Sequence, residues 1–251
     1  MNAVVFDEGD ALPGGLVALR GDRARHVLEV LGALPGDSIR AARLGGALHP
    51  GARIVRIEGS GPDAAVVVDP GPTAAPPARC PADLALALPR PKCLRRLWPQ
   101  LAALGPSRVF VTAAEKVEKS YWGCTWLREE ERGALLREGL SQACDSVPPQ
   151  IEIRRRLKPF LEDEIPSLYP EGMRFFAHPS QEAGGGVAAF REACRAPGGP
   201  VLVAVGPEGG WSPFECAMFD RLGFRRVSLG PRILRTDTAV VALLSMAALR
   251  D

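Results

Sequence analysis

The stretch VLVAVGPEGGWSPFE, residues 201–215, decides the fold of this chain. Its first five residues are all apolar, which is typical of a central β-strand covered on both faces. Ser212 and Glu215 have the spacing of a capping box, and Pro213 falls at the first helical position, where its missing N–H costs nothing. The stretch therefore predicts a strand, a glycine-rich turn and a helix that Gly223 ends.

The turn itself, GPEGG at residues 206–210, has two interpretations. It lacks the usual phosphate-binding spacings, because neither GxGxxG nor GxxxxGK[ST] is present. It is either a tight structural turn or a loop whose backbone N–H groups face a ligand above the sheet.

Strand-like apolar runs alternate with helical patterns through the larger part of the chain. The runs cover residues 84–89, 108–113, 151–156, 174–178, 201–205 and 225–230. This alternation predicts the α/β class, with a mostly parallel sheet and helices on both faces. Ligands of such sheets bind at the carboxyl ends of the strands.

Two more strand ends carry candidate site residues. The run FFA leads into His178 and Pro179, and VSLG (227–230), expected as a short strand, leads into PRILRTDTA. His178 alone is more often a structural histidine than a catalytic one. The helix expected over 238–249 lacks a polar face, so it either runs through the core or packs against a second subunit.

The first part of the chain has a different composition. Residues 69–83, DPGPTAAPPARCPAD, are rich in proline and predict a linker between two domains. Before it, short alternating segments separated by turns predict a small β-rich domain or barrel. One helix is expected there, capped by Asp22. Its apolar face consists of Val27, Val30 and Leu31.

Bulk composition excludes several classes of protein. The formal net charge of +2 does not by itself indicate a nucleic-acid partner, so local clusters of charge must be considered. Six cysteines and three histidines are widely spaced, without a CxxC pair, so we expect neither a metal site nor a disulfide framework. The apolar runs are too short for a membrane span, and the N-terminus is acidic where a signal peptide is basic. We therefore expect a cytoplasmic protein.

Three motifs together resemble a known family. GPEGGWSPFE (206–215), LGPRILRTDTA (229–239) and the AHP turn (177–179) are similar to the RsmE-type 16S ribosomal RNA (uracil-N3) methyltransferases of the SPOUT, or alpha/beta knot, superfamily. The resemblance extends over residues 86–97, 115–122, 138–153 and 157–166. In the first domain it rests on ARHVLEVL and PGD alone.

The resemblance implies a fold, a cofactor and an assembly. Residues 1–74 would form a PUA-like β-barrel for RNA binding, 75–82 a linker, and 83–251 a SPOUT methyltransferase domain with a trefoil knot. Members of the superfamily bind S-adenosyl-L-methionine and act as homodimers. Carried over by position, the cofactor pocket would consist of His178, Pro179, Gly206, Pro207, Glu208, Gly209, Gly210, Leu229, Gly230, Ile233, Leu234 and Thr236.

The implied reaction requires an imide nitrogen, N3 of uridine, to lose its proton and attack a methyl group. The charge that grows on O2 or O4 must be stabilised. Glu208 and Asp237 are candidate bases, and Arg232 and Arg235 are candidates for stabilising the charge. Alternatively, Glu208 and Arg235 pair and only hold the loops together, or positioning acts without a dedicated base.

Basic residues around residue 90 indicate RNA binding. Cations at a helix start oppose the macrodipole, so local stability does not favour them there, whereas phosphate binding does. The expected RNA-binding residues are Arg90, Lys92, Arg95, Arg96 and Lys119. Pro99 is expected to break or kink that helix. The cluster at 154–158 is as much a candidate for a solvated face as for an RNA contact.

Aromatic residues and departures from the family pattern complete the picture. Tyr121 and Trp122 beside lysines can stack on a base, although at least one is expected to pack in the core. Gly32 stands where relatives carry an arginine, and Asp237 is one methylene shorter than the family's usual glutamate. Because of these two differences, RNA binding by the first domain and the role of Asp237 stay open.

The leading hypothesis is an S-adenosylmethionine-dependent methyltransferase that acts, as a homodimer, on N3 of a uridine in small-subunit ribosomal RNA. Its substrate is the RNA or the assembled small subunit. One alternative is a non-catalytic RNA-binding or ribosome-assembly factor on a knotted scaffold. The other is a SPOUT methyltransferase with another RNA target, such as a ribose 2′-hydroxyl or a transfer RNA.

Overall fold

The computed structural model describes residues 2–179 and 185–249. Within this part the chain divides into two compact units. Of the described residues, the first contains 2–78 and 136–148, and the second contains 79–135, 149–179 and 185–249. Each unit is described by itself. The functional boundaries expected from the sequence, at residues 74 and 83, stay a prediction.

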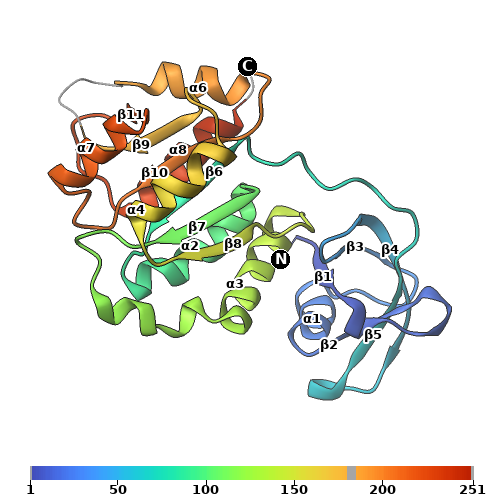
Figure 1. The fold of residues 1–251 in the computed structure, drawn as a ribbon. Coiled ribbons are helices and arrows are strands. Elements are labelled where there is room, and N and C mark those ends of the chain that lie inside the picture. The colour runs from blue at the N-terminus through green and yellow to red at the C-terminus, as the bar shows by residue number, and fades with distance from the viewer. Residues whose placement is uncertain (1, 180–184, 250–251) are drawn as a thin grey trace. The chain divides into compact units, whose positions relative to one another are not determined.

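The described part of the first unit contains a curled five-stranded sheet in the order β1-β3-β4-β5-β2 (Figure 1). The strands are β1 (Val4–Phe6), β2 (Val17–Arg20), β3 (Ser38–Arg43), β4 (Leu48–Glu58) and β5 (Ala65–Asp69). Neighbours are antiparallel except β1 and β3, and register shifts interrupt the pairing of β4 with both β3 and β5. Such bulges bend strands and let a small sheet curl into a barrel-like form. The expected β-rich first domain is confirmed.

Residues from the middle of the chain complete this unit. The N–H groups of Asn2 and Ala3 both donate to the carbonyl oxygen of Ser141, each at 3.0 Å. Arg137 forms an ion pair with Asp7 at 2.7 Å. Residues 136–148 therefore pack with the N-terminal strands although they follow them by a long stretch of sequence.

The helix expected in the first unit differs from its prediction. It begins as α1 (Asp22–Arg25) and continues as a π-helical turn (His26–Val30). Gly21 is the N-cap and no side chain caps the helix, so the prediction for Asp22 is wrong. Val27 is buried, but Val30 is 69% exposed and Leu31 49% exposed, so the expected shared apolar face is wrong as well. A π turn adds a residue per turn, which rotates the residues after Val27 away from the face that a 3.6-residue period predicts.

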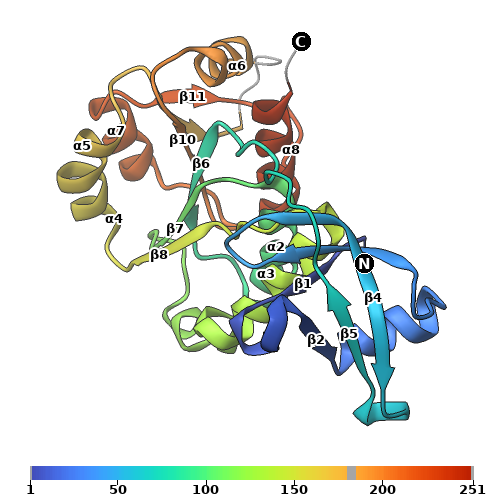
Figure 2. The same cartoon turned by 90° about the vertical axis from the view of Figure 1, so that its right-hand side faces the viewer.

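The second unit is built on a sheet whose six described strands are all parallel, in the order β11-β9-β10-β6-β7-β8 (Figures 1 and 2). Their bounds are β6 (Ala82–Ala87), β7 (Arg108–Thr112), β8 (Gln150–Arg154), β9 (Arg174–Ala177), β10 (Val201–Val205) and β11 (Arg225–Val227). The two central strands, β6 and β10, are buried along their whole length, which explains their continuous apolar sequences. The run expected over 225–230 is a strand only to Val227, because residues 228–230 turn away into the next loop.

Helices cover both faces of this sheet, as expected (Figure 2). One face carries α4 (Leu157–Pro159), α5 (Ile165–Leu168) and α7 (Pro213–Arg221), while α2 (Pro91–Leu104), α6 (Val187–Arg195) and α8 (Thr236–Ala248) lie on the other. The remaining helix is α3 (Glu129–Ala143). The expected fold class, α/β with a PUA-like barrel-like sheet before a parallel sheet, is confirmed. The trefoil knot stays a prediction.

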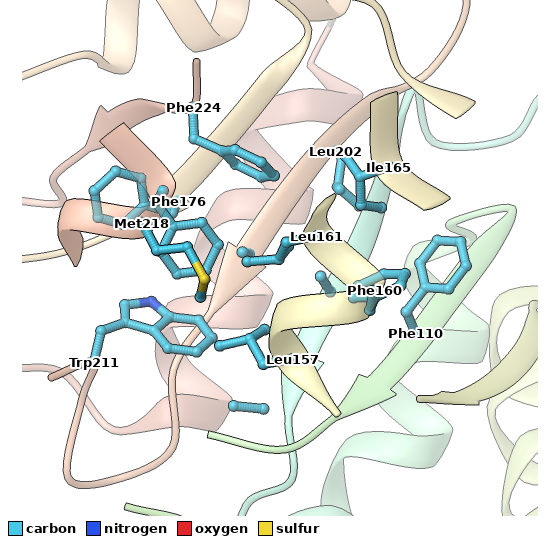
Figure 3. Close-up of a cluster of buried hydrophobic side chains, with 14 of the residues drawn as sticks. Phe110, Leu157, Phe160, Leu161, Ile165, Phe176, Leu202, Trp211, Met218 and Phe224 are labelled. Atoms are coloured by element: carbon cyan, nitrogen blue, oxygen red, sulfur yellow. The ribbon is translucent and has the colours of Figure 1, made fainter. Parts of the chain in front are cut away.

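The core on the first of these faces joins strands and helices from distant parts of the sequence (Figure 3). Phe110 of β7, Phe176 of β9 and Leu202 of β10 pack against Leu161 and Met218 from the covering helices. Trp211 belongs to this cluster and follows directly on the glycine-rich turn. The turn is therefore attached to the core by a large buried ring.

The helix after the glycine-rich turn has the predicted ends. Ser212 accepts a hydrogen bond from the Glu215 N–H while the Glu215 side chain accepts one from Ser212, so the capping box is confirmed. Pro213 is the first helical residue, and Gly223 follows the C-cap with a positive φ of 74°.

Two other helices differ from expectation. α2 runs without interruption through Pro99, because Leu94, Leu97, Trp98 and Leu101 are buried around it and offset a cost of about 3 kcal/mol for an internal proline. α8 begins at Thr236, not 238. It is buried along one side only, so the interpretation of a helix buried all round within a single chain is wrong.

Candidate functional site

Three loops meet at the carboxyl edge of the parallel sheet. They follow β9, β10 and β11, and together with Lys116 and Ala239 they line a cavity of about 330 Å³. The cavity contains every residue that the resemblance assigned to the cofactor pocket. The rest of its lining comes from the last residues of these strands, the three loops and the start of α8: Ala177, His178, Pro179, Val205, Gly206, Pro207, Glu208, Gly209, Gly210, Trp211, Val227, Leu229, Gly230, Arg232, Ile233, Leu234 and Thr236.

Tight packing favours glycine at two positions of the turn, and backbone conformation favours it at a third. A Cβ on Gly206 would lie 3.3 Å from the Trp211 ring, and one on Gly209 would lie 3.0 Å from Cδ of Lys116. Gly210 has a φ of 67°, which is the left-handed region that favours glycine, and its N–H donates to the Pro207 carbonyl at 2.8 Å. The wall of the cavity is therefore backbone at these positions.

Lys116 is a lining residue that the sequence did not single out. Its Nζ donates to the carbonyl oxygens of Gly209 at 2.8 Å and Trp211 at 3.5 Å. It lies in the loop after β7. Because ligands of parallel sheets bind at the carboxyl ends of the strands, the position of Lys116 just after a predicted strand could have identified it as a candidate. Its neighbour Glu115 is attached as well, because its N–H donates to the Glu215 carboxylate at 2.7 Å. The loop after β7 thus holds the C-terminal end of the glycine-rich turn and the start of α7.

Glu208 has a backbone partner rather than a charged one. Its carboxylate accepts from the N–H of Arg90, with oxygen distances of 3.1 and 3.3 Å. Arg90 is the N-cap of α2 and no side chain of its own caps the helix, so Glu208 supplies a negative charge at the positive end of that helix. Among the described residues Glu208 does not pair with Arg235, so that alternative is not observed.

Arg235 lies at the N-cap of α8 and pairs with Asp237, with 3.4 Å between Nε and Oδ1. Asp237 also accepts from Arg96 of α2 at 2.7 Å. Burial acts to raise the pKa of Asp237, but the hydrogen bond from Arg96 and the charge of Arg235 outweigh it and hold that pKa below its usual value. Asp237 is therefore ionised and doubly engaged at neutral pH, which makes it a weak base.

His178 follows β9, and its backbone N–H donates to the Val227 carbonyl at 3.1 Å. Its ring Nδ1 lies 3.7 Å from Sγ of Cys216. Burial and the nearby charge of Arg226 lower the pKa of His178, so the ring is neutral at pH 7. A neutral imidazole can shape the cavity wall without adding charge to it.

The residues expected to bind RNA are exposed at the start of α2 and in the loop after β7. Arg90, Lys92, Arg95 and Arg96 are all exposed at the start of α2, while Leu94 and Leu97 face inward, as predicted. Lys119 opens a 3-10 turn, Lys119–Gly123, and is exposed. Arg96 is the residue of this set that forms an ion pair with Asp237.

The described part of the chain gives little support for a metal site, a reactive thiol or a membrane-spanning helix. Among residues 2–179 and 185–249, no group of three His, Cys, Asp or Glu side chains could hold a metal ion. The cysteines described there are free thiols, and burial raises the pKa of Cys93 to about 11. In the same residues, no helix has the length and apolar character that crossing a membrane requires.

Comparison with known proteins identifies the family to which this chain belongs. A family model described as an RNA methyltransferase domain matches residues 76–248. The ribosomal RNA small subunit methyltransferase E of Treponema pallidum is 27% identical over 245 residues, which are 96% of this chain and 88% of that protein. The enzyme of the same name from Synechocystis is 50% identical over 52 residues, 20% of this chain and 17% of its own length.

Two solved structures share the fold over nearly the whole chain. The methyltransferase E of Neisseria gonorrhoeae, bound to S-adenosyl methionine, has a TM-score of 0.71 and 21% identity over 97% of this chain and 95% of that one. A Legionella pneumophila methyltransferase in complex with its bound cofactor SAM has a TM-score of 0.65 and 21% identity, covering 98% and 97%. Because the family model spans most of the sequence and all six described strands of the parallel sheet, this chain belongs to the RNA methyltransferase domain family.

Proposed function

We propose that this protein is an S-adenosyl-L-methionine-dependent methyltransferase that methylates N3 of a uridine in small-subunit ribosomal RNA. The observation that carries the proposal is the cavity at the carboxyl edge of the parallel sheet. Three loops far apart in the sequence bring all the residues expected for the cofactor into its lining. The names of the full-length Treponema relative and of the Neisseria structure support the same substrate and cofactor.

The lining fits this cofactor. A Cβ at Gly206 or Gly209 would make tight contacts with Trp211 or Lys116, so at these glycines peptide groups form the wall and are available to the polar parts of a ligand. Val205, Leu229 and Leu234 provide apolar surface for the adenine ring and the methionine chain. Trp211 adds a buried Nε1 that has no hydrogen-bond partner among the described residues. When bound, S-adenosylmethionine supplies an electrophilic methyl group.

The chain's own residues then bind and polarise the uracil. Arg232 lines the cavity, and Arg235 begins the helix at its edge with a side chain that is 68% exposed. We assign to these two guanidinium groups the stabilisation of negative charge on O2 or O4 as N3 loses its proton. Asp237 holds Arg235 in position through their ion pair.

Glu208 has a different part in this proposal. Its carboxylate is engaged by the Arg90 N–H, so it fixes the glycine-rich turn against the start of α2. The proton of N3 then leaves to solvent, and positioning of the uracil together with charge stabilisation accounts for the rate. A role as general base is the competing assignment for Glu208, and the pH dependence predicted below separates the two.

The proposal includes a homodimer that acts in the cytoplasm on ribosomal RNA or the assembled small subunit. The support for the homodimer is the apolar surface of α8 and of the loop that precedes it. Ile233 is 85% exposed and Leu249 is 58% exposed, and the outer side of α8 carries half-buried apolar residues such as Val241 and Met246. Apolar side chains of this kind, on one helix and the loop before it, are typical of a surface that a second subunit covers.

Transfer of a labelled methyl group tests the function. Purified protein, labelled S-adenosylmethionine and small ribosomal subunits that lack the modification are incubated, and the digested RNA is analysed by nucleoside chromatography. We expect label in 3-methyluridine, and none with Arg235→Ala at equal cofactor binding. Label in a 2′-O-methylated nucleoside would assign another target. Cofactor binding without transfer to any ribosomal or transfer RNA would contradict the enzyme and favour an assembly factor.

A further inference from the structure

Beside the cavity, the loop after β7 carries two tryptophans on a fixed backbone. Residues Lys119–Gly123 and Thr125–Leu127 form two consecutive 3-10 turns. The buried ring of Trp98 in α2 donates from Nε1 to the carbonyl oxygen of Trp126 at 2.8 Å, which ties the second turn to that helix. Trp122 and Trp126 are themselves only half-buried, so part of each ring is accessible.

Each of these rings lies under an arginine from another element. The guanidinium carbon of Arg95, in α2, lies 5.1 Å from the centre of the Trp126 ring. That of Arg155, just after β8, lies 5.2 Å from the centre of the Trp122 ring. Stacking on a ring restricts the guanidinium group but leaves its N–H donors available, so less entropy is lost when it binds a phosphate.

Ion pairing distinguishes the cations here from several other arginines of the same unit. Arg108, Arg154, Arg221 and Arg226 all form ion pairs with carboxylates. Within residues 2–179 and 185–249, none of Arg90, Lys92, Arg95, Lys119 and Arg155 has a carboxylate within ion-pair distance. Unpaired cations at the start of α2 oppose its macrodipole, so helix stability does not account for them.

These unpaired cations and accessible tryptophan rings begin at the rim of the cavity. The backbone N–H of Arg90 is hydrogen-bonded to Glu208, a lining residue. The hydrogen bond from Tyr121 to Glu118 raises the pKa of Tyr121, and the nearby guanidinium group of Arg90 opposes that rise. Tyr121 is followed directly by Trp122, whose ring contacts Arg155. Cations and rings therefore continue from the cavity across the carboxyl ends of β6, β7 and β8.

We propose that Arg90, Arg95, Trp122, Trp126 and Arg155, here called the arginine–tryptophan row, bind a single-stranded segment of RNA that flanks the nucleotide in the cavity. The inference rests on the proposed function and specifies its substrate as an unpaired strand. The arginines contact phosphates, and the accessible parts of the tryptophan rings stack on bases, which a duplex does not expose. A target base that must enter a cavity is reached most easily in such a strand.

Binding of a labelled oligonucleotide tests the row. The probe is a fluorescein-labelled single-stranded oligouridylate, measured by fluorescence anisotropy over a range of salt concentrations, with the same strand annealed to its complement as the duplex probe. Trp122→Leu is expected to weaken single-strand binding about tenfold. Arg155→Gln is expected to weaken it about fivefold and to lower the salt slope by about one. Duplex binding should be weaker than single-strand binding in the wild type.

Arg221→Gln is the matched control, because it removes the same charge from an exposed arginine of this unit that pairs with Glu162. We expect it to bind like the wild type. Unchanged affinity in both row variants, or an equal loss in Arg221→Gln, would overturn the row. Calorimetric affinity for S-adenosylmethionine should be unchanged in all three variants, and a loss there would indicate general damage and count against the inference.

Kinetics separate this inference from the function on which it rests. With small subunits as substrate, the row variants should raise KM about five- to tenfold with kcat nearly unchanged. Normal methyl transfer with unchanged KM would leave the function standing and overturn the row. A wild-type protein that binds the single strand through the row but transfers no methyl group would support the row and overturn the function.

Discussion

The two ends of the parallel sheet use polar residues in opposite ways. At the amino ends of the strands, Asp83 of β6 is completely buried and accepts from the N–H of Arg108 at 2.8 Å and the hydroxyl of Tyr169 at 2.7 Å. Arg174, the first residue of β9, is buried too and donates to the carbonyl oxygens of Tyr169 and Leu222. These buried groups have their partners within the chain, and they close that end of the sheet.

At the carboxyl ends the same strands lead into loops that hold a cavity. Here the wall is glycine backbone, Arg232 and Arg235 are exposed, and the cations of the arginine–tryptophan row have no carboxylate partner among the described residues. In this sheet, residues at the amino ends of the strands stabilise the fold, and residues at the carboxyl ends are proposed to bind ligands. Substitutions at the amino end should therefore change the free energy of unfolding, and substitutions at the carboxyl end should change ligand affinity.

The largest effect is expected for Asp83→Ala. It leaves the Tyr169 hydroxyl and the buried part of Arg108 without an acceptor, so we expect a loss of about 3–5 kcal/mol in the free energy of unfolding. Chemical denaturation followed by tryptophan fluorescence measures it. Tyr169→Phe is the milder companion, with an expected loss of about 1–2 kcal/mol. If the folded fraction of Asp83→Ala binds S-adenosylmethionine much more weakly than wild type, the separation of the two ends fails.

Gly209→Val should weaken cofactor binding at the carboxyl end of the parallel sheet. The added side chain begins 3.0 Å from Cδ of Lys116, so either the lysine or the turn must move, and we expect at least about a hundredfold loss in affinity for S-adenosylmethionine. The free energy of unfolding should fall by less than in Asp83→Ala. Gly133→Val is the control, because a Cβ there meets no atom within 4 Å. Retained tight binding in calorimetry would contradict the assignment of the cavity.

Glu208→Gln sharpens the comparison at the rim of the cavity. An amide oxygen can still accept the Arg90 N–H, so a residue that only holds the turn should tolerate the change. We expect kcat to fall by less than about threefold and the pH dependence of kcat to keep its shape. Rate measurements between pH 5 and 9 check this. A large loss of kcat together with the disappearance of an acidic limb would assign the base to Glu208 instead.

The smallest effect is expected for Asp237→Asn, which removes a paired carboxylate from the carboxyl end. The pKa of Asp237 is lowered in the folded state, so its ionised form contributes stability above its unfolded pKa of about 4. That contribution is lost as the pH falls through the folded pKa. The variant should be less stable than wild type by under about 1 kcal/mol at pH 7, and the difference should vanish in acid. A difference that persists unchanged at low pH would show that charge is not its cause.

Much of the second unit could be predicted from the sequence because its signals are local. A continuous apolar run such as Val201–Val205 indicates a buried parallel strand, and the Ser212–Glu215 box fixes the start of the next helix. The cavity residues followed from the resemblance, and the fold brings them together. The contacts of Lys116 with Gly209 and of Glu208 with Arg90 could not be predicted, because they join loops about a hundred residues apart without any periodic pattern.

The errors have local causes as well. Val30 and Leu31 were assigned to a buried face with a 3.6-residue period, but a π turn changes that period at His26. Of the break or kink expected at Pro99, the break does not occur, because propensity is a weaker effect than the burial of the leucines and Trp98 around it. In both cases tertiary packing decides the outcome, and a single sequence does not report it.

The order of the strands also sets the order in which the molecule can form during synthesis. β10 lies between β6 and β9, and Val203 pairs with both Leu84 and Phe175, so the centre of the sheet cannot close until a late segment has left the ribosome. The first unit likewise waits for residues 136–148, although its last strand ends at Asp69. Long-range closure of this kind slows folding. The nascent chain must therefore hold two incomplete units at once, and the loops that line the cavity are among the last parts to be assembled.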